Sequence, residues 1–152
     1  MVKIPQITKI RGVSIAGKGS TSPEYALNDR TNKIFSYVEA YNNMDIGKMT
    51  VDFDDQIVFL NIINGENTME LHGIEDFKKQ AIEALSYFSE RQQSIETLTH
   101  NIDSTEISIS YRAIAAMDFP NGLKKGDEIT LKGKSVFEFS ADGKIVRLTD
   151  IA

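Results

Sequence analysis

The chain contains no cysteine and only two histidines, His72 and His100, among its 152 residues. The absence of cysteine excludes disulfide bonds, thiolate nucleophiles, cysteine-ligated zinc and iron–sulfur clusters. Two histidines are too few for a zinc site that is built from three of them. We therefore expect no metal and no cofactor, and the groups left for chemistry are mainly carboxyls and phenols.

Long apolar runs are also missing. No segment approaches the roughly 18–20 residues that a membrane-spanning helix needs, so no membrane span is expected. A net charge of −5 argues against a nucleic-acid-binding protein, which needs a basic surface. No glycine-rich phosphate-binding loop is present, so nothing indicates a nucleotide or a flavin. With 41% hydrophobic and 26% charged residues, the composition is that of one ordinary globular domain.

The basic charge is concentrated at the beginning of the chain. Residues 1–20 contain four basic and no acidic side chains, so the remainder has nine more acidic than basic side chains. Glycines and a Ser-Thr-Ser-Pro segment follow, which predicts a basic arm and linker over residues 1–28 and a folded domain over residues 29–152. The arm is either a basic contact for an acidic partner or a membrane surface, or a frayed terminus or added edge strand. It lacks the apolar core of a signal peptide, so a cytoplasmic location is expected.

The spacing of apolar residues predicts helices mainly in the first half of the chain and strands in the second half. The first half is expected to form a helix from Asp29 or Thr31 to about residue 41, a short helix over 46–53, strands over 56–63 and 68–72, and a helix from 73 to about 91. The second half is expected to form strands over 93–101, 106–118, 128–140 and 144–151.

Helices that are segregated from consecutive antiparallel strands define an α+β fold. We expect a curved, mixed, largely antiparallel sheet that wraps around a long helix. Such a sheet encloses a cone-shaped cavity, and the mouth of the cone is a natural ligand pocket.

Three segments then resemble a known family. They are YVEAYNNMD at residues 37–45 followed by FDDQIVF at 53–59, HGIEDF at 72–77, and KSVFEFSADGKIV at 134–146. Together they resemble the nuclear transport factor 2-like superfamily, with its cystatin-like fold, and within it the SnoaL-like group. The resemblance covers about residues 30–152, although Phe53 directly precedes Asp54 where the family has one residue between them.

The resemblance implies a fold that hosts isomerases, dehydratases, cyclases, epoxide hydrolases and non-enzymatic binding domains, so the fold alone does not define the reaction. Steroid isomerases of this fold use a tyrosine, an aspartate base and a protonated aspartic acid. The corresponding positions here are Tyr37, Asn61 and Ser135. Because an amide does not accept a proton at neutral pH, isomerase chemistry of that type is not expected.

Epoxide hydrolases of this fold need an Asp–Arg–Asp arrangement. Arg112 and Arg147 are the arginines considered for it, but Arg112 is followed two residues later by Ile114 rather than by an aspartate. We therefore do not expect epoxide hydrolysis.

Asp150 is the remaining candidate for a cavity acid. It alternates with Thr149 in the last strand, and the resemblance implies that its face of the strand lines the cavity. Burial would favour its neutral form, which could act as a general acid with Tyr37 or His100 assisting. The alternative is a structural aspartate bonded to Tyr37, Ser135 or a backbone amide.

We predict that the domain binds a small hydrophobic molecule in a mostly apolar cavity. The alternatives are a lyase, isomerase or cyclase that uses Asp150, and a non-enzymatic dimerisation module. The residues expected around a ligand are Tyr37, Tyr41, Phe59, Asn61, Ser135, Phe137, Leu148 and Asp150.

Simple alternation also leaves more apolar residues than one face of the sheet can hold. We expect that Ile107, Ile109, Val136 and Ile145 do not all point inward, so that some of them form an apolar outer face. This expectation favours a homodimer that associates through the sheet.

Overall fold

The computed structural model describes residues 23–152, and the predicted basic arm therefore lies almost entirely outside the described residues. In the described part the chain forms three helices and a six-stranded sheet. The elements are α1 (Pro23–Asn42), α2 (Ile46–Met49), β1 (Phe53–Ile63), β2 (Glu66–His72), α3 (Ile74–Ala84), β3 (Phe88–His100), β4 (Ser104–Ala115), β5 (Glu128–Phe139) and β6 (Ile145–Ile151). No helix between residues 23 and 152 is both long enough and apolar enough to cross a bilayer.

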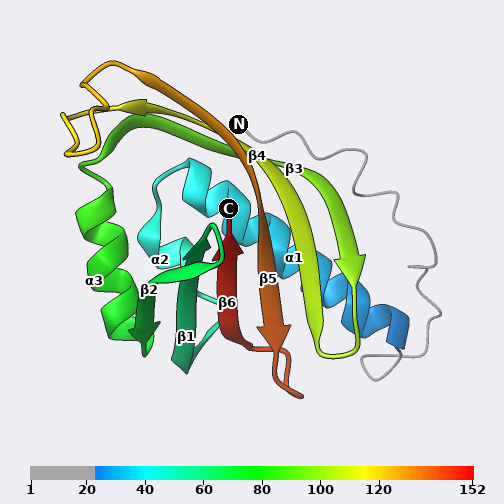
Figure 1. The fold of residues 1–152 in the computed structure, drawn as a ribbon. Coiled ribbons are helices and arrows are strands. Elements are labelled where there is room, and N and C mark those ends of the chain that lie inside the picture. The colour runs from blue at the N-terminus through cyan, green and yellow to red at the C-terminus, as the bar shows by residue number, and fades with distance from the viewer. Residues whose placement is uncertain (1–22) are drawn as a thin grey trace.

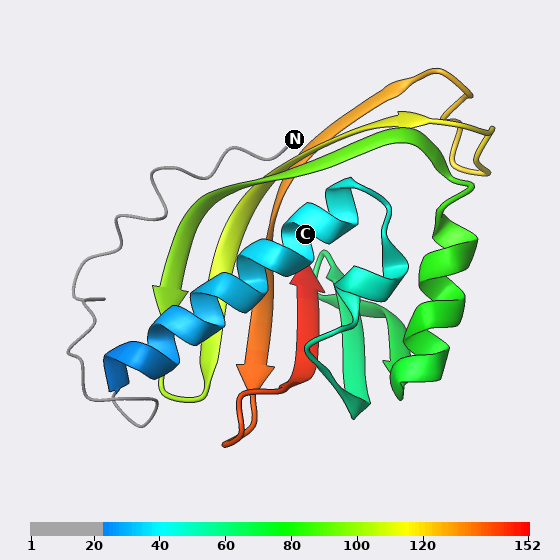
Figure 2. The same ribbon diagram turned by 180° about the vertical axis from the view of Figure 1, so that it is seen from behind.

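The strands lie in the order β2-β1-β6-β5-β4-β3. Neighbouring strands are antiparallel except for β1 and β6, which are parallel, so the sheet is mixed. Strands β3, β4 and β5 are 13, 12 and 12 residues long, and they bend around α1 (Figures 1 and 2). The predicted α+β class and the curved mixed sheet around a long helix are confirmed.

Helix α1 lies against the concave face of the sheet (Figure 2). Ile34 and Val38 are fully buried, as their spacing of four residues predicts for one face of a helix. The helix begins at Pro23, six residues before the expected cap at Asp29. Glu24 lies in its first turn, where a carboxylate interacts favourably with the helix dipole.

The prediction for α3 was wrong at its end. The helix stops at Ala84, and Phe88 begins β3 instead of continuing the helical stripe. Phe88 and Arg91 pair with Ala115 and Ala113 of β4, so their backbone groups are used in the sheet. The helical spacing of Phe88 was accidental, and long-range strand pairing determines its structure.

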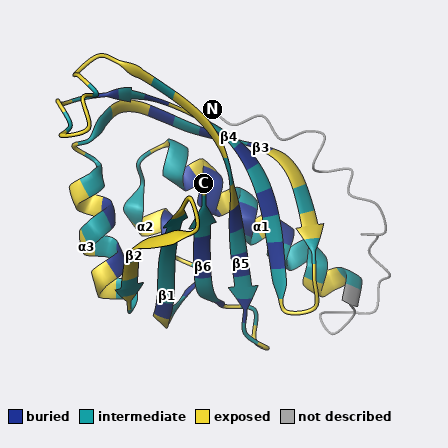
Figure 3. Cartoon of the chain, viewed as in Figure 1, coloured by how far each residue is buried: buried dark blue, intermediate teal, exposed yellow. Residues whose placement is uncertain are grey.

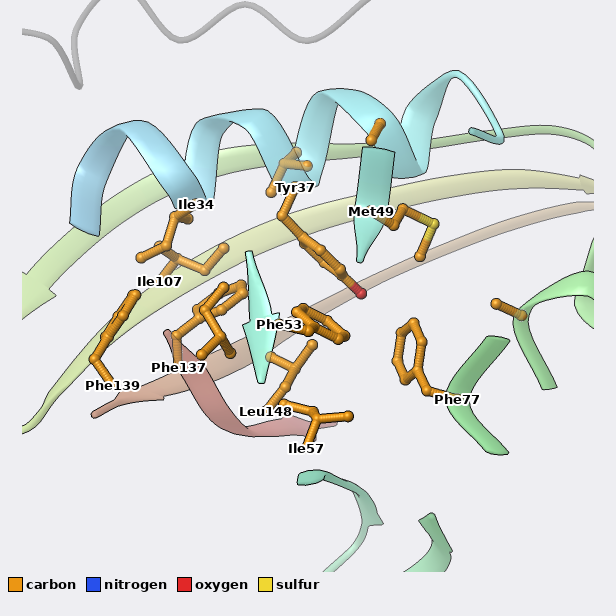
Figure 4. Close-up of a cluster of buried hydrophobic side chains, with 14 of the residues drawn as sticks. Ile34, Tyr37, Met49, Phe53, Ile57, Phe77, Ile107, Phe137, Phe139 and Leu148 are labelled. Atoms are coloured by element: carbon orange, nitrogen blue, oxygen red, sulfur yellow. The ribbon is translucent and has the colours of Figure 1, made fainter. Parts of the chain in front are cut away.

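The core is built on aromatic contacts between α1, the sheet and α3 (Figure 4). The Tyr37 ring stacks on Phe53 at 5.8 Å and meets the edge of Phe137 at 5.6 Å. Phe77 of α3 lies 4.9 Å from Phe53 and 5.5 Å from Phe59, in edge-to-face geometry. These contacts fix Tyr37 at the centre of the fold because each aromatic pair contributes about 0.5–1.5 kcal/mol beyond simple burial.

Burial alternates along β4 and β5 (Figure 3). Ile107, Ile109 and Ile145 belong to the buried core, so the expectation that the four residues do not all point inward holds for Val136 alone. Ile107 and Ile109 share one face of β4 by simple alternation, and Ile145 lies beside the buried Phe139 of β5, so all three face the core. Val136 alternates with the buried Ser135 and Phe137 along β5. It therefore points to the outer face of the sheet, where it is half-buried.

Candidate functional site

A cavity of about 210 Å³ lies between α1, α3 and the sheet. Its walls are largely apolar, and its polar groups come from α1, α3, β1, β3 and β6. The lining residues are Tyr37, Tyr41, Met49, Phe59, Asn61, Met69, Leu71, Phe77, Gln80, Ala81, Ala84, Phe88, Arg91 and Asp150. Many apolar walls with a few polar groups are typical of small-molecule sites.

Asp150 provides the acidic group of this cavity. It lies between Asn61 of β1 and Ser135 of β5 in the register of the sheet. The Ser135 hydroxyl donates a hydrogen bond of 2.7 Å to its Oδ1. Burial of the carboxyl raises its pKa to about 6, and the Ser135 hydrogen bond opposes part of that rise. Near neutral pH the group therefore exchanges a proton readily, as a general acid or base must.

Tyr37 brings a phenol from α1 to the same cavity. Its hydroxyl points away from the helix, toward the side of the core where Met49 and Phe77 lie (Figure 4). Burial raises the pKa of Tyr37 far above its usual value, and the charge of the nearby Asp150 adds to the rise. Tyr37 therefore stays protonated, and it serves as a hydrogen-bond donor rather than as a base.

Arg91 is a cavity residue that the sequence analysis missed. It extends from β3, and its guanidinium carbon lies 3.8 Å from the centre of the Tyr41 ring. Its Nε donates to the Tyr41 carbonyl oxygen at 3.0 Å, and the Tyr41 hydroxyl donates to that of Tyr111 at 3.0 Å. Burial raises the pKa of both phenols. Ile95, Gln93 and Arg91 lie two residues apart, so strand alternation would have placed Arg91 on the same inner face as the buried Ile95. The predicted helix extended to Arg91 and concealed this pattern.

A second cavity, of about 220 Å³, adjoins the first and shares Tyr41, Asn61 and Asp150 with it. Ser135 lines this second cavity together with Gln93 and Tyr111. Of the eight residues expected around a ligand, the structure therefore gathers six at the two cavities: Tyr37, Tyr41, Phe59, Asn61, Ser135 and Asp150.

Phe137 and Leu148 lie elsewhere than expected. Both are fully buried in the core and line neither cavity. Phe137 contacts the ring of Tyr37, so it supports a cavity residue instead of touching a ligand.

His100 is not brought to Asp150, and the expected pairing of the two is corrected. His100 lies at the end of β3, and three strand spacings of about 4.8 Å separate the strands that carry the two residues. Both ring nitrogens are engaged, with Thr31 Oγ1 at 3.2 Å and Thr105 Oγ1 at 2.8 Å. Burial lowers the pKa of His100, with a smaller contribution from the charge of Arg30. The residue ties α1 to the sheet.

The arginines considered for an epoxide hydrolase arrangement face away from the cavity. Arg112 pairs with Glu90 and Glu128, and Arg147 pairs with Glu138. Arg91 is the arginine that faces inward, but the residue two positions later is Gln93, which has no carboxylate. In residues 23–152, no three histidine, aspartate or glutamate side chains gather as a metal site requires.

The fold and this cavity define a class of small α+β domains with a ligand-sized interior. Residues 34–148 match the family model of the SnoaL-like domain, and the chain belongs to that family. A comparison with curated protein sequences finds no match.

Solved structures show the same fold. A candidate polyketide cyclase from Xanthomonas campestris pv. campestris is 18% identical, with a TM-score of 0.70 over 84% of this chain and 92% of that one. An NTF2-like protein of unknown function from Burkholderia pseudomallei is 15% identical, with a TM-score of 0.65 over 80% and 88%. A cystatin-fold protein from Novosphingobium aromaticivorans is 14% identical, with a TM-score of 0.63 over 81% and 97%. The predicted relationship to NTF2-like and cystatin-fold proteins is confirmed.

Proposed function

We propose that this domain binds a small, mostly apolar molecule in the cavity between α1, α3 and the sheet. The observation that carries the proposal is the cavity itself, whose apolar walls end at the half-buried Asp150. Its volume of about 210 Å³ is below the roughly 300–1,000 Å³ of drug-sized pockets, so the ligand has about the size of a single ring.

A cavity-filling substitution tests this proposal. Ala84 of α3 lines the cavity and is half-buried, so Ala84→Phe should occupy the space that the ligand needs. A panel of neutral and acidic single-ring compounds would be titrated by two-dimensional NMR of the ¹⁵N-labelled protein. We expect shifts of the β1 and β6 amides in the wild type and their loss in Ala84→Phe. Ala141→Phe, at an exposed turn, is the matched control. The proposal fails if no compound binds, or if Ala84→Phe binds as the wild type does.

Acid–base catalysis at this site is a second candidate function, and a specific observation favours it. A pKa of about 6 lets Asp150 remove a proton from a carbon next to a carbonyl and return it at another atom. Tyr37, which stays protonated, would donate a hydrogen bond to the enolate oxygen that forms. Isomerisations, eliminations and cyclisations of ketones share this step. The fold neighbour described as a candidate polyketide cyclase is compatible with it.

Asp150→Asn separates the two functions. The amide keeps the shape and can still accept the hydrogen bond from Ser135, but it cannot take up a proton. We expect ligand binding to persist and any turnover of a ketone substrate to fall by about 10²–10⁴-fold. Unchanged turnover in Asp150→Asn would rule out catalysis by this residue.

We also propose that two copies of the chain associate through the outer face of the sheet. Val58, Leu60 and Ile62 of β1 alternate with the cavity-side residues, and the register places Thr149 and Ile151 of β6 beside Leu60 and Ile62. Val58, Leu60, Ile62 and Ile151 are apolar and half-buried, Thr149 is buried among them, and Arg147 lies beside Val58 at one end of this group. Size-exclusion chromatography with light scattering should give twice the chain mass of 17.0 kDa. A single-chain mass at micromolar concentration would refute the association.

A further inference from the structure

Arg91 is a buried cation in the cavity, and the described residues provide no carboxylate for it. Its exposed fraction is 7%. None of the ion pairs within residues 23–152 includes it. Its contacts are the ring and carbonyl oxygen of Tyr41 and a long approach of 4.0 Å to the Met49 sulfur.

These contacts satisfy only part of the guanidinium. The group has five N–H donors, and a thioether is a weak acceptor. A buried charge is costly unless it is paired and hydrogen-bonded. Asp150 lines the same cavity, but its carboxylate accepts a hydrogen bond from Ser135 of β5 and forms no ion pair with Arg91. The described residues therefore leave N–H donors of Arg91 available to an anion in the cavity.

Gln93 provides a second, independent sign of a missing polar group. Its exposed fraction is 6%, and its Oε1 has no hydrogen-bond donor in the described part of the chain. The residue lines the second cavity, two positions along β3 from Arg91. The Asn42 side chain holds its backbone with two hydrogen bonds, of 2.7 and 3.0 Å. These two bonds fix the backbone from which the unpaired side-chain oxygen of Gln93 projects, so this oxygen is available as an acceptor.

We propose that the two adjoining cavities recognise a small organic acid whose carboxylate pairs with Arg91 in the first cavity and whose hydroxyl donates to Gln93 in the second. The planar guanidinium can pair with a carboxylate through two parallel hydrogen bonds. Its contact with the Tyr41 ring orients the guanidinium plane before a ligand binds. The ring or chain of the acid occupies the apolar walls. This inference rests on the proposed small-molecule binding and adds the charge class of the ligand.

Four probes of nearly equal shape test the charge requirement. Benzoate and 3-hydroxybenzoate carry the carboxylate, and benzamide and 3-hydroxybenzamide replace it with a neutral amide. Their dissociation constants for the full chain would be measured by NMR titration at pH 5. We expect each acid to bind at least about tenfold more tightly than its amide, as hydrogen bonds to charged groups do. The hydroxyl should strengthen binding further through Gln93.

Variants assign the preference to Arg91. Arg91→Met keeps the length of the side chain without its charge, and it should remove the preference for acids. Arg112→Met, which replaces an exposed arginine of β4 that pairs with Glu90 and Glu128 and lines neither cavity, should leave the preference unchanged. If Arg91→Met does not fold, the comparison of acids with amides on the wild type still decides.

The possible failures are distinct. Equal binding of acids and amides overturns this inference and leaves the proposed small-molecule binding intact. A preference for acids that survives in folded Arg91→Met also overturns it. If none of the four probes binds but neutral ketones do, the charge class is wrong and the cavity function stands. If no compound of either kind binds, both proposals fail.

Discussion

Replacing Asp150 with asparagine should change how the stability of the protein depends on pH. The carboxyl has a pKa of about 6 in the folded state and about 3.8 when it is not perturbed. Between these values the folded protein keeps the proton and the unfolded chain has lost it. The contribution of Asp150 to stability therefore decreases as the pH rises from about 4 to about 6, and it stays constant above that.

The size of this effect follows from the difference between the two pKa values. One pKa unit corresponds to about 1.4 kcal/mol, so the wild type loses up to about 3 kcal/mol of stability across this interval because of Asp150. Asparagine does not ionise and avoids that loss, while its Oδ1 can still accept from Ser135. We expect the free energy of unfolding of Asp150→Asn, relative to the wild type, to increase by that amount between pH 4 and pH 7.

Urea unfolding followed by far-ultraviolet circular dichroism at several pH values measures this difference. Asp55→Asn is the control, because Asp55 is an exposed aspartate of β1. Parallel stability curves for Asp150→Asn and the wild type would refute the burial of the carboxyl. If the free energy of unfolding of the wild type instead increases relative to that of Asp150→Asn as the pH rises, the folded state stabilises the ionised carboxylate. That result would also mean that Arg91 is paired with Asp150, against the arrangement described above.

Three further outcomes are expected. The affinity for benzoate should fall as the pH rises through about 6 in the wild type but not in Asp150→Asn, because the ionised Asp150 carboxyl repels the anion. The neighbouring phenols stay protonated over this range, and titration at pH 5 and pH 8 measures the change in affinity. Gly133→Ala should lower the free energy of unfolding by about 1–3 kcal/mol, because a Cβ there would lie 2.8 Å from the Ile151 carbonyl oxygen. Gly47→Ala, where a Cβ meets only ordinary contact distances, should not lower it, and urea unfolding of both variants measures the difference. His100→Gln should lower stability by about 1 kcal/mol and leave benzoate affinity unchanged, since it loses hydrogen bonds between α1 and the sheet.

Local patterns were sufficient for most of the fold. Alternation in the second half of the chain and the turn at residues 141–143 predict the β5–β6 hairpin, and that hairpin places Ser135 opposite Asp150. The pair at the centre of the site is therefore a short-range consequence of the sequence. The placement of Asn61 beside Asp150 depends instead on the parallel pairing of β1 and β6, which lie far apart in the chain. Only the resemblance to a known family could predict it.

The boundary between α3 and β3 could not be predicted locally. Phe88 continues the helical spacing of Phe77 and Ala81, and only its pairing with Ala115 of β4 assigns it to a strand. That error concealed Arg91, because the predicted helix covered the residues that open β3. The most informative polar residue of the cavity was therefore the one whose position depends most on long-range pairing.

The cavity contains two groups that make folding less favourable, and they do not compensate each other. Burial raises the pKa of Asp150 to about 6, and Arg91 has no carboxylate partner among residues 23–152. If the two were paired, each would be stabilised, but the acid would have a low pKa and the cation would be unavailable to a ligand. Their separation leaves a proton-exchanging acid at one side of a small apolar space and an anion-binding group at another. A ligand that carries both a carboxylate and a carbonyl would meet the two groups at once, so its acid end would orient its reactive end toward Asp150.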